Sequence, residues 1–342
     1  MKKNLCYNGE KYLKIKCAIG EGETNMRILA ALLLGGSLLC ASAPLFSHVG
    51  DRRLASQEKL AESTSAPPAY EDIIYRQQAG KEVIKAEKPM INSSGLTLEE
   101  RFSVPEGYAR VEKPLGSFQA YLRQYHLKPD KSPVLLHDGR KKAAQDIHAA
   151  VFAMPMVEGD LQQCADSVIR MYGEYFWLME DYESISFHLT NGFLMDYSSW
   201  MSGKRLSVNG NQVSWITKAS YDNSRESFTK YLRQVMVYAG TLSLDKESSP
   251  VEEGKILAGD LFIRGGSPGH CIMVVDTAED SQGNQCFLLA QGYMPAQEFH
   301  VLKNPLHEED PWYYESEIQD TLITPEYVFE KGSLKRWKEF KQ

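Results

Sequence analysis

Residues 160–179 read DLQQCADSVIRMYGEYFWLM, and this stretch decides the fold. Asp160 is a residue type that caps helix N-termini, and Gln163 stands three positions later, where a capping box needs Glu or Gln. The apolar side chains recur at the three- and four-residue spacing of one helix face. They are Leu161, Cys164, Ala165, Val168, Met171, Tyr172, Tyr175 and Met179. The sequence therefore predicts a long helix that begins at Asp160 and buries one face in the core.

The rest of the chain favours one further long helix and several strands. The second helix is predicted to begin near Ser224 and to end at Gly240, with Phe228 and Leu232 on its buried face. Runs rich in β-branched and aromatic residues predict strands. They are AAVFAMP from Ala149, SISFHLT from Ser184, NQVSWIT from Asn211, LFIR at 261–264, HCIMVVD at 270–276, CFLLAQ at 286–291 and EFHVL at 298–302. Because short Gly, Pro, Ser and Asn turns separate the last four runs, we expect an antiparallel meander. The predicted fold class is α+β, with the long Cys-bearing helix packed on that meander.

The composition is that of a globular protein. The 342 residues are 43% hydrophobic and 24% charged, so the chain can bury a core and is neither disordered nor fibrous. It has 38 Lys plus Arg against 45 Asp plus Glu, a net charge of −7. Binding to nucleic acid depends on a basic face that releases counterions from phosphates, and the sequence shows none. We therefore expect no nucleic-acid partner.

An apolar run near the start predicts export. Residues 28–39 read ILAALLLGGSLL, which has the length of a signal-peptide core and is short for a membrane span. The small residues CASA at 40–43 follow as a cleavage region, and Met26 is the expected true start of translation. Residues 1–43 are therefore assigned to an export signal that directs the protein to the periplasm or cell envelope. Cys40 leaves a lipid anchor open, so the membrane would be contacted only through that anchor or the signal.

The remaining chain is predicted to be a linker followed by one domain. Residues 44–94 are rich in Ser, Ala, Pro, Lys, Glu and Gln and lack sustained periodicity, which is typical of a flexible linker. Regular structure is expected to begin near Leu96, where residues 97–111 read as a strand-like stretch. Residues 95–342 then form a single α+β domain without an internal repeat.

Most standard catalytic signatures are missing from the sequence. There is no HExxH, no CxxC pair, no Walker loop and no dinucleotide fingerprint, and we expect no cofactor. Residues 265–269, GGSPG, match the GxSxG pattern of serine hydrolases, but that motif needs a helix after the Ser and an N–H on the next residue. Pro268 has no N–H and a β-branched run follows it, so the segment is predicted to be a tight turn.

Cys164 and His270 form the candidate catalytic pair, one near the start of a predicted helix and the other at the start of a predicted strand. The positive end of a helix and a neighbouring imidazolium both stabilise a thiolate. Cys164 is therefore the candidate nucleophile and His270 the candidate general base. Gln291 ends the following strand, from where its amide oxygen could accept the ring N–H of His270 and orient the ring. Gln163, or its neighbour Gln162, is the candidate that assists the Cys164 backbone amide in stabilising an oxyanion.

The order of these residues resembles the papain-like cysteine hydrolases, in particular the bacterial NlpC-type and CHAP-type amidases and peptidases. In that group the Cys opens a helix packed on a sheet, and the His begins a strand shortly after a GDL-type turn. Here GDLF at 259–262 precedes Gly269 and His270. The nucleophile's neighbours differ, since those families usually carry Asp-Cys-Ser and residues 163–165 read Gln-Cys-Ala. The resemblance implies a papain-like fold and hydrolysis of amide bonds in cell-envelope peptide or peptidoglycan.

A second resemblance covers nearly the whole predicted domain. Five stretches, in order, are similar to a bacterial domain-of-unknown-function family, number 4846. They are LQQCADSVIRMYGEYFW, FHLTNGFLMDYSSWMSGKR, VYAGTLSL, GDLFIRGGSPGHCIMVVD and LLAQGYMPAQEFHVLKNP. This resemblance implies an exported domain and no established activity.

Non-catalytic interpretations of the same residues stay open. Cys164 lies on the apolar face of its own helix, where a free Cys is commonly a small buried hydrophobe. His270 could have a purely structural role, as a hydrogen-bond partner for the turn that precedes it. The alternative function is then a non-catalytic envelope protein that binds glycan or peptide, with Trp200, Trp215 and Trp312 as candidates to line its groove.

Two further groups of residues have structural and chemical interpretations. A metal hydrolase would need His137, Asp146 and His148 to converge around one ion, whereas a surface ion pair explains the last two as well, and we expect no metal. Cys271 and Cys286 are predicted to pack within strands. The hairpin between those strands would not place them opposite each other, so no disulfide is expected between them.

Overall fold

The structure, a computed structural model, describes residues 89–252, 254–318 and 320–340. They belong to one of the two units into which the chain divides, Glu87–Gln342. The predicted export signal at 1–43 and most of the predicted linker at 44–94 lie outside the described residues. Strand-like pairing is already present at the end of the linker range, because Ile91 forms a β-bridge with Phe102.

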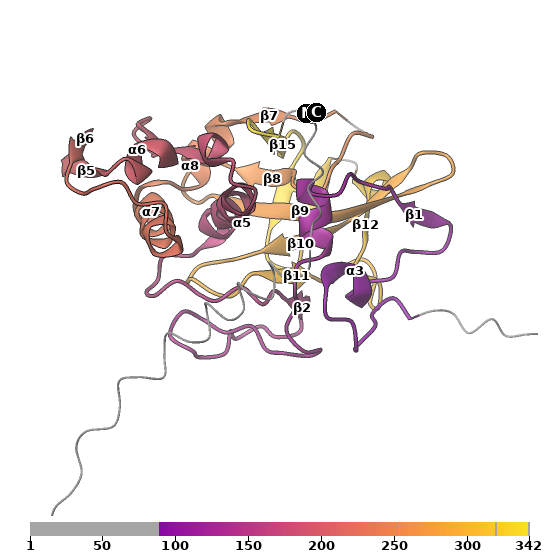
Figure 1. The fold of residues 1–342 in the computed structure, drawn as a ribbon. Coiled ribbons are helices and arrows are strands. Elements are labelled where there is room, and N and C mark those ends of the chain that lie inside the picture. Colours follow the sequence, from indigo (N-terminus) through magenta and orange to yellow (C-terminus); the bar gives the residue numbers. More distant parts are fainter. Residues whose placement is uncertain (1–88, 253, 319, 341–342) are drawn as a thin grey trace, which may run out of the picture. The chain divides into compact units, whose positions relative to one another are not determined.

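In the described part of the chain, the centre of the domain is an antiparallel sheet of nine strands (Figure 1). Seven of them lie in the order β2-β11-β10-β9-β8-β15-β7, while β1 pairs with β9 and β12 pairs with β10. The bounds are β1 Tyr108–Arg110, β2 His148–Val151, β7 Ser248–Pro250, β8 Leu261–Arg264, β9 His270–Asp280, β10 Gln285–Gln291, β11 His300–Leu302, β12 Tyr313–Tyr314 and β15 Leu334–Trp337. The long strands β9 and β10 pair along most of their length and carry the smaller strands at their ends.

The predicted C-terminal meander is confirmed. β8, β9, β10 and β11 are hydrogen-bonded to one another in chain order, and every pair is antiparallel. Side chains of β9 alternate between two cores: Cys271, Met273 and Val275 belong to one, and Ile272 and Val274 to the other. Because both faces of this strand are covered, its sequence is a continuous apolar run rather than an alternating one.

The Cys-bearing helix lies on one face of the sheet, as predicted, but it begins one turn later. α5 spans Cys164–Leu178 and packs on β9 and β10 (Figure 1). The predicted start at Asp160 is wrong, because its carboxylate accepts a hydrogen bond from the backbone N–H of Ala296 at 2.6 Å and is held outside the helix. Gln163 is the N-cap instead, and its backbone N–H donates to the Asp166 carboxylate at 3.1 Å.

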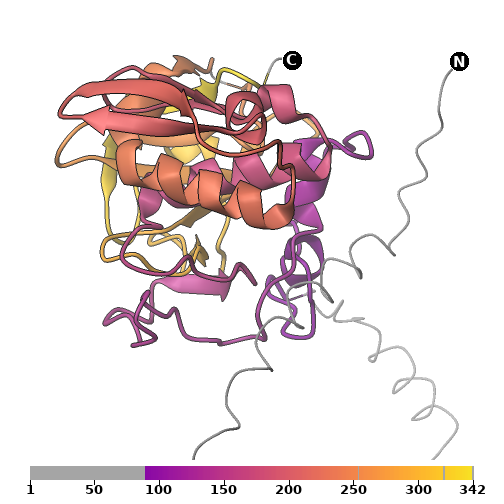
Figure 2. The same ribbon diagram turned by 60° about the vertical axis from the view of Figure 1, so that its left-hand side comes forward.

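Further helices extend the layer on this face of the sheet. α7 spans Arg225–Tyr238 and begins at the predicted cap, since the Ser224 hydroxyl accepts a hydrogen bond from the backbone N–H of Ser227. Figure 2 shows α7 in front of the sheet, with the β5–β6 hairpin above it. The other elements of this layer are α4 Phe118–Arg123, η1 Tyr182–Ser184, β3 Ser186–His188, β4 Leu194–Asp196, α6 Tyr197–Met201, β5 Lys204–Asn209, β6 Gln212–Thr217 and α8 Thr241–Lys246. None of the helices within the described ranges is both long and apolar enough to cross a membrane.

A two-stranded ribbon packs on the opposite face of the sheet. Its strands are β13, Thr321–Ile323, and β14, Val328–Glu330, and we call residues 321–330 the C-terminal ribbon. Leu322 and Phe329 are buried in the second core beside Phe262 of β8. The ribbon therefore covers part of the face that α5 does not.

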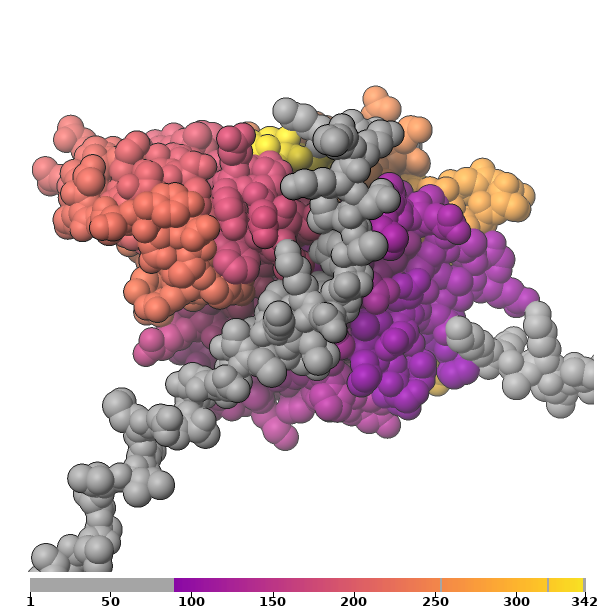
Figure 3. Space-filling model, in the orientation of Figure 1, coloured from indigo at the N-terminus to yellow at the C-terminus, as the bar shows by residue number. Residues whose placement is uncertain are grey.

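The start of the domain contains less strand than predicted. Within the strand-like stretch 97–111, residues Leu98–Arg101 form helix α3, because Thr97 and Glu100 make a capping box. Only Tyr108–Arg110 is a strand there, at the sheet edge on β9. In the space-filling view this early segment, coloured indigo to purple, and the red to orange surface of α6 and α7 lie on two sides of the visible face (Figure 3).

Candidate functional site

The first turn of α5 lies against the end of β10. A Cβ atom on Gly292 would be 2.5 Å from Ser167 Oγ and 2.9 Å from the Gln163 carbonyl oxygen, so this approach requires glycine. Gly292 directly follows Gln291, the last residue of β10. Cys164, the first residue of α5, therefore lies near the strand end that carries Gln291.

His270 begins β9 directly after the turn at 265–269, and the prediction of a tight turn is confirmed. Arg264 and His270 are cross-strand partners at its two ends, and the turn leads into a strand rather than a helix. Gly269 has no room for a side chain, because a Cβ atom would lie 2.6 Å from Thr241 Oγ1. This close packing against α8 fixes the point at which the His270 strand begins.

The structure brings His270 and Gln291 together. Nε2 of His270 lies 2.8 Å from Oε1 of Gln291, and both side chains are buried. The amide oxygen can only accept, so Nε2 carries the proton and Nδ1 the lone pair of the neutral ring. The rings of Tyr293, Tyr327 and Phe329 surround His270 at centroid distances of 4.7, 5.0 and 5.8 Å. This burial lowers the pKa of His270 to about 4, so the imidazole is neutral at pH 7.

No hydrogen bond joins Cys164 to His270 among the described residues. In the described part of the chain the His270 ring hydrogen-bonds Gln291 and not the Cys164 thiol. Cys164 is 6% exposed, and burial raises the pKa of its thiol to about 11, although the backbone N–H groups of Ala165 and Cys271 lower it in part. Both partners are therefore neutral at pH 7, and a thiolate–imidazolium pair is not formed in this conformation.

Tyr293 packs against His270 and lies close enough to Cys164 for the thiol to affect the pKa of its hydroxyl. Its ring centroid is 4.7 Å from that of His270. Burial raises the pKa of its hydroxyl, and the nearby groups Glu326 and Cys164 raise it further. The side chain is only partly buried. Tyr293 is therefore the candidate for a side chain that separates the thiol from the imidazole.

A charged network holds Gln291 from the side opposite His270. Gln291 Nε2 donates to Glu326 Oε2 at 2.6 Å, and Lys142 Nζ donates to Glu326 Oε1 at 2.6 Å.

A second histidine also lies beside Gln291. His300 Nε2 is 3.5 Å from the same amide nitrogen, and His300 Nδ1 is 2.8 Å from the Glu298 carbonyl oxygen. Burial lowers the pKa of His300 to about 3, so this second ring is also neutral.

Sequence reasoning did not find these network residues. Glu326 lies in the turn of the C-terminal ribbon, and Lys142 lies in the long connection before β2. Neither position has a motif or a periodic pattern around it. His300 had a usable signal, because it falls in the predicted strand at 298–302, next to the strand that ends in Gln291.

The two glutamines proposed for an oxyanion site already have other partners. Gln162 is fully buried, accepts a hydrogen bond from Arg170 at 2.5 Å and donates to the Met154 sulfur at 3.4 Å. Gln163 donates from Nε2 to Asp160 Oδ1 at 3.3 Å. Gln163 is the more accessible of the two, so it remains the candidate with a side chain that could be redirected.

The residues considered for a metal hydrolase do not form a metal centre. Within the described ranges no group of three His, Cys, Asp or Glu side chains is placed to hold an ion. His148 Nε2 instead lies 3.0 Å from the Ser132 carbonyl oxygen. His137 and Asp146 belong to the connection before β2 and do not join His148 in a cluster.

The other two cysteines of the described residues pack in strands, as predicted. Cys271 and Cys286 are free and fully buried. Cys271 lies opposite Ile263 and Cys286 opposite Ala278, so the two sulfurs are not cross-strand partners.

The three tryptophans considered for a groove pack at separate places. Trp312 and Trp200 are buried, and their indole N–H groups donate to the carbonyl oxygens of Ser103 at 2.8 Å and of Ser227 at 3.1 Å. Trp215 packs edge-on against Phe193, with ring centroids 5.6 Å apart. Core and hairpin packing therefore accounts for these side chains.

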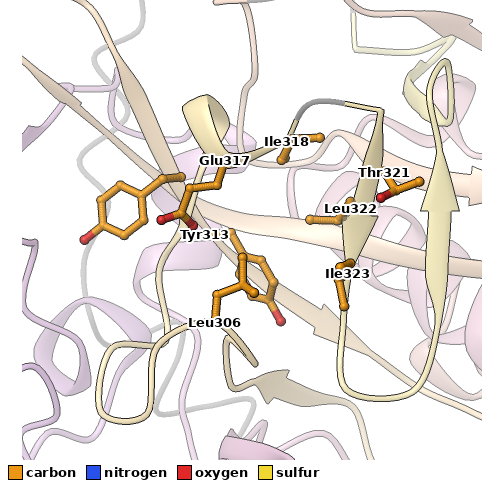
Figure 4. Close-up of a pocket in the computed structure, with 8 residues that line it drawn as sticks. Leu306, Tyr313, Glu317, Ile318, Thr321, Leu322 and Ile323 are labelled. Atoms are coloured by element: carbon orange, nitrogen blue, oxygen red, sulfur yellow. The ribbon is translucent and has the colours of Figure 1, made fainter.

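Two hollows lie on the sheet face that carries the C-terminal ribbon. One has a volume of about 530 Å³ and includes Phe262 and the end of the ribbon in its lining. The other, of about 30 Å³, lies between Tyr313 and Leu322 (Figure 4). Neither is lined by His270 or Gln291, so neither opens onto the candidate pair.

Fold and site together define an α+β protein in which a helix packs on an antiparallel sheet and a buried His–Gln pair lies at neighbouring strand ends. The chain belongs to the DUF4846 family, described as domain of unknown function (4846), whose model matches residues 98–336. This match confirms the family predicted from the five stretches of sequence. No curated protein and no solved structure matches the chain.

Proposed function

We propose that the domain is an exported, papain-like cysteine amidase or peptidase that cleaves amide bonds in cell-envelope peptides or peptidoglycan. The observation that supports this most is the His270–Gln291 hydrogen bond of 2.8 Å, at strand ends that meet the first turn of α5. A base oriented by an amide, near a helix that begins with a cysteine, is the set of groups that acyl transfer through a thiolate needs.

Each group has a distinct role in this proposal. His270 takes the thiol proton on Nδ1, because its Nε2–H is held by Gln291. The Cys164 thiolate adds to the amide carbonyl carbon, and the Cys164 backbone N–H with the Gln163 side chain stabilises the oxyanion. The C–N bond then breaks while the imidazolium returns the proton to the leaving amine. Water, deprotonated by His270, hydrolyses the thioester and restores the thiol.

The proposal requires a conformation that differs from the one described. The Cys164 thiol, with its pKa raised to about 11 by burial, is not hydrogen-bonded to His270. Tyr293 packs on His270, is only partly buried and lies in electrostatic range of Cys164, so we propose that its displacement lets the sulfur reach Nδ1 around the end of the sheet. A peptide that binds along the end of β10 would supply this displacement.

Export is part of the same proposal and rests on the sequence. The apolar run at 28–39 and the small residues at 40–43 have the form of a signal peptide, with a lipid anchor on Cys40 as the variant form. Peptides and peptidoglycan are the amide substrates that such a domain meets in the envelope.

A second candidate function is a non-catalytic envelope protein that binds peptide or glycan. The observation that favours it is the state of Cys164, which is 6% exposed and carries a thiol whose pKa burial raises to about 11. A thiol in that state is a packing residue rather than a nucleophile. In this case His270 and Gln291 would stabilise the meeting of β9, β10 and the C-terminal ribbon.

Alkylation of the folded full chain with iodoacetamide at a series of pH values separates the two functions. Mass spectrometry of the Cys164 peptide would follow the rate, with the buried Cys271 and Cys286 as internal controls for unfolding. Because the proposed hydrolase forms its ion pair only when Tyr293 is displaced, it predicts alkylation of Cys164 near pH 7 in Tyr293→Ala and a loss of that reactivity when His270→Ala is added. A binding protein predicts alkylation only at alkaline pH, with no effect of His270→Ala.

Turnover of peptidoglycan fragments and of short peptides tests the hydrolase directly. Cys164→Ala and Cys164→Ser should both abolish release of new amino groups, since neither provides a thiolate. A Cys164→Ala protein with full activity would show that the nucleophile is wrong.

A further inference from the structure

We propose that Glu326 is a positioning residue, which fixes the amide orientation of Gln291 and thereby selects the His270 tautomer with its proton on Nε2. The choice of tautomer is a property of the folded chain alone, whereas its importance for catalysis rests on the proposed function. None of the sequence patterns pointed to Glu326, which lies in the turn of the C-terminal ribbon.

A glutamine can present either of two faces to a histidine. The amide oxygen accepts a hydrogen bond and requires an N–H on the facing ring nitrogen, whereas the amide NH₂ donates and requires a lone pair there. The two amide orientations have nearly the same shape, so packing alone does not choose between them. If Gln291 turned its NH₂ group to His270, the ring proton would move to Nδ1. Nδ1 could then no longer accept a proton from a thiol.

Glu326 determines which end of the Gln291 amide faces His270, because a carboxylate can only accept hydrogen bonds. Its Oε2 lies 2.6 Å from Gln291 Nε2, so the NH₂ group faces the carboxylate and the amide oxygen faces His270. Lys142 pairs with the other carboxylate oxygen at 2.6 Å and is itself buried, which keeps the carboxylate in place. Charge-assisted hydrogen bonds of this length are the stronger class in proteins.

His300 supports the same orientation but more weakly. Its Nδ1 faces the Glu298 carbonyl oxygen at 2.8 Å and must donate, so the neutral ring has its lone pair on Nε2. That lone pair is directed to the Gln291 NH₂ group at 3.5 Å, a long distance for a hydrogen bond. Both acceptors therefore require the same amide orientation, and Glu326 makes the shorter contact.

The ribbon that carries Glu326 also packs on the imidazole itself. Tyr327 and Phe329 lie against the His270 ring with centroids 5.0 and 5.8 Å away. One ten-residue segment, 321–330, thus both surrounds His270 and sets the hydrogen bond that orients it.

Nitrogen NMR of the full chain, labelled with ¹⁵N-histidine, tests the inference. Imidazole nitrogens that carry a proton resonate apart from those with a lone pair, and a His270→Gln variant assigns the signals. We expect a single neutral tautomer for His270 in the unmodified protein, protonated on Nε2. Glu326→Ala should give a mixture of the two tautomers, because no carboxylate then accepts from the Gln291 NH₂ group.

Glu330→Ala is the matched control, since it removes an exposed carboxylate from the same ribbon and should leave the His270 signals unchanged. A single Nε2–H tautomer in folded Glu326→Ala would overturn the proposal. If Glu326→Ala does not fold, the unmodified protein still decides, because a proton on Nδ1 of His270 contradicts the inference. The NMR signals do not depend on Cys164, so a failure of the hydrolase proposal in the alkylation assay would be seen separately.

Discussion

Arg123 donates from Nε to the Asp276 carboxylate at 2.8 Å and so joins α4 to the middle of β9. Asp276 is fully buried, and Arg110 of β1 donates to its other oxygen at 2.6 Å. The backbone N–H of Thr277 adds a third donor at 2.9 Å. A buried carboxylate is stable only when it is paired and hydrogen-bonded in this way. The cluster therefore holds the early part of the domain on the strand that begins with His270.

Replacement of Asp276 by alanine should strongly destabilise the domain. The change leaves Arg123 and Arg110 without their partner, and the side chain of Arg123 is only 8% exposed. Breaking a buried ion pair by removal of one member costs about 3–5 kcal/mol. Urea unfolding should show this loss as a lower midpoint. Glu226→Ala is the control, since its pair with Lys230 is on the surface and its loss should not move the midpoint measurably. Equal effects of the two changes would contradict the role given to Asp276.

Replacement of Gly292 by alanine should force the end of β10 away from α5. The added methyl group would lie 2.5 Å from Ser167 Oγ and 2.9 Å from the backbone oxygen of Gln163, and the backbone cannot rotate away as a side chain can. Overpacking of this kind costs about 1–3 kcal/mol. Gly240→Ala is the control, because no atom lies within 4 Å of its added methyl group. Thermal unfolding of both variants measures the difference, and a Gly292→Ala protein as stable as Gly240→Ala would show that the approach is looser than described.

The pH dependence of stability should reflect mainly His270, His300 and Asp166, whose pKa values burial shifts far from their usual values. Burial lowers the pKa of His270 to about 4 and of His300 to about 3, from 6.5, so their contribution is present above pH 6.5 and is lost as the pH falls through these values. Burial raises the pKa of Asp166 from 3.8 to about 7, which has the opposite sign: its contribution is present below pH 3.8 and is lost as the pH rises through 7. The two histidines outweigh Asp166, and the shifts of His148, which burial lowers, and of Asp260, which burial raises, oppose each other, so the free energy of unfolding should increase from about pH 4 to about pH 6.5.

Asp166→Asn isolates the opposing group. The asparagine oxygen can still accept from the Gln163 backbone N–H, as the carboxylate does at 3.1 Å. Without the titrating carboxyl, the slope of the unfolding free energy against pH should increase by the amount that corresponds to about one bound proton. Urea unfolding at several pH values gives the slope, and Glu226→Gln serves as the exposed control. An unchanged slope in Asp166→Asn would show that Asp166 titrates normally in the folded protein.

The sequence predicted those features of the fold that depend on a pattern within a single segment. The meander, α7 and the helix face of α5 were predictable because their patterns repeat within one segment. The start of α5 was not, because the natural cap Asp160 is taken by the backbone of Ala296, which is distant in the sequence. A contact between residues so far apart in the sequence produces no recognisable pattern in the residues next to the helix.

The candidate site divides in the same way. His270 and Gln291 lie near the ends of one hairpin, so antiparallel pairing was enough to expect their contact. Glu326 and Lys142 reach Gln291 from the C-terminal ribbon and from the connection before β2. Only the packing of these segments brings them together, and no spacing in the sequence encodes it. The burial of Cys164 was one of two interpretations left open, because its helix face was predictable and the segments that cover it were not.

Tyr293→Ala should expose the candidate pair and speed the alkylation of Cys164. The tyrosine ring is 4.7 Å from His270, and its hydroxyl is close enough to Cys164 for the thiol to affect its pKa. Loss of this ring should lower the cost of local opening by roughly 1.4 kcal/mol, which corresponds to about a tenfold faster reaction of the thiol. Mass spectrometry of the Cys164 peptide after brief iodoacetamide treatment measures the rate. Tyr221→Ala is the control, because Tyr221 is 63% exposed and its removal should leave the rate unchanged. A Tyr293→Ala protein that is folded and no more reactive than the original would show that another part of the structure limits access to Cys164.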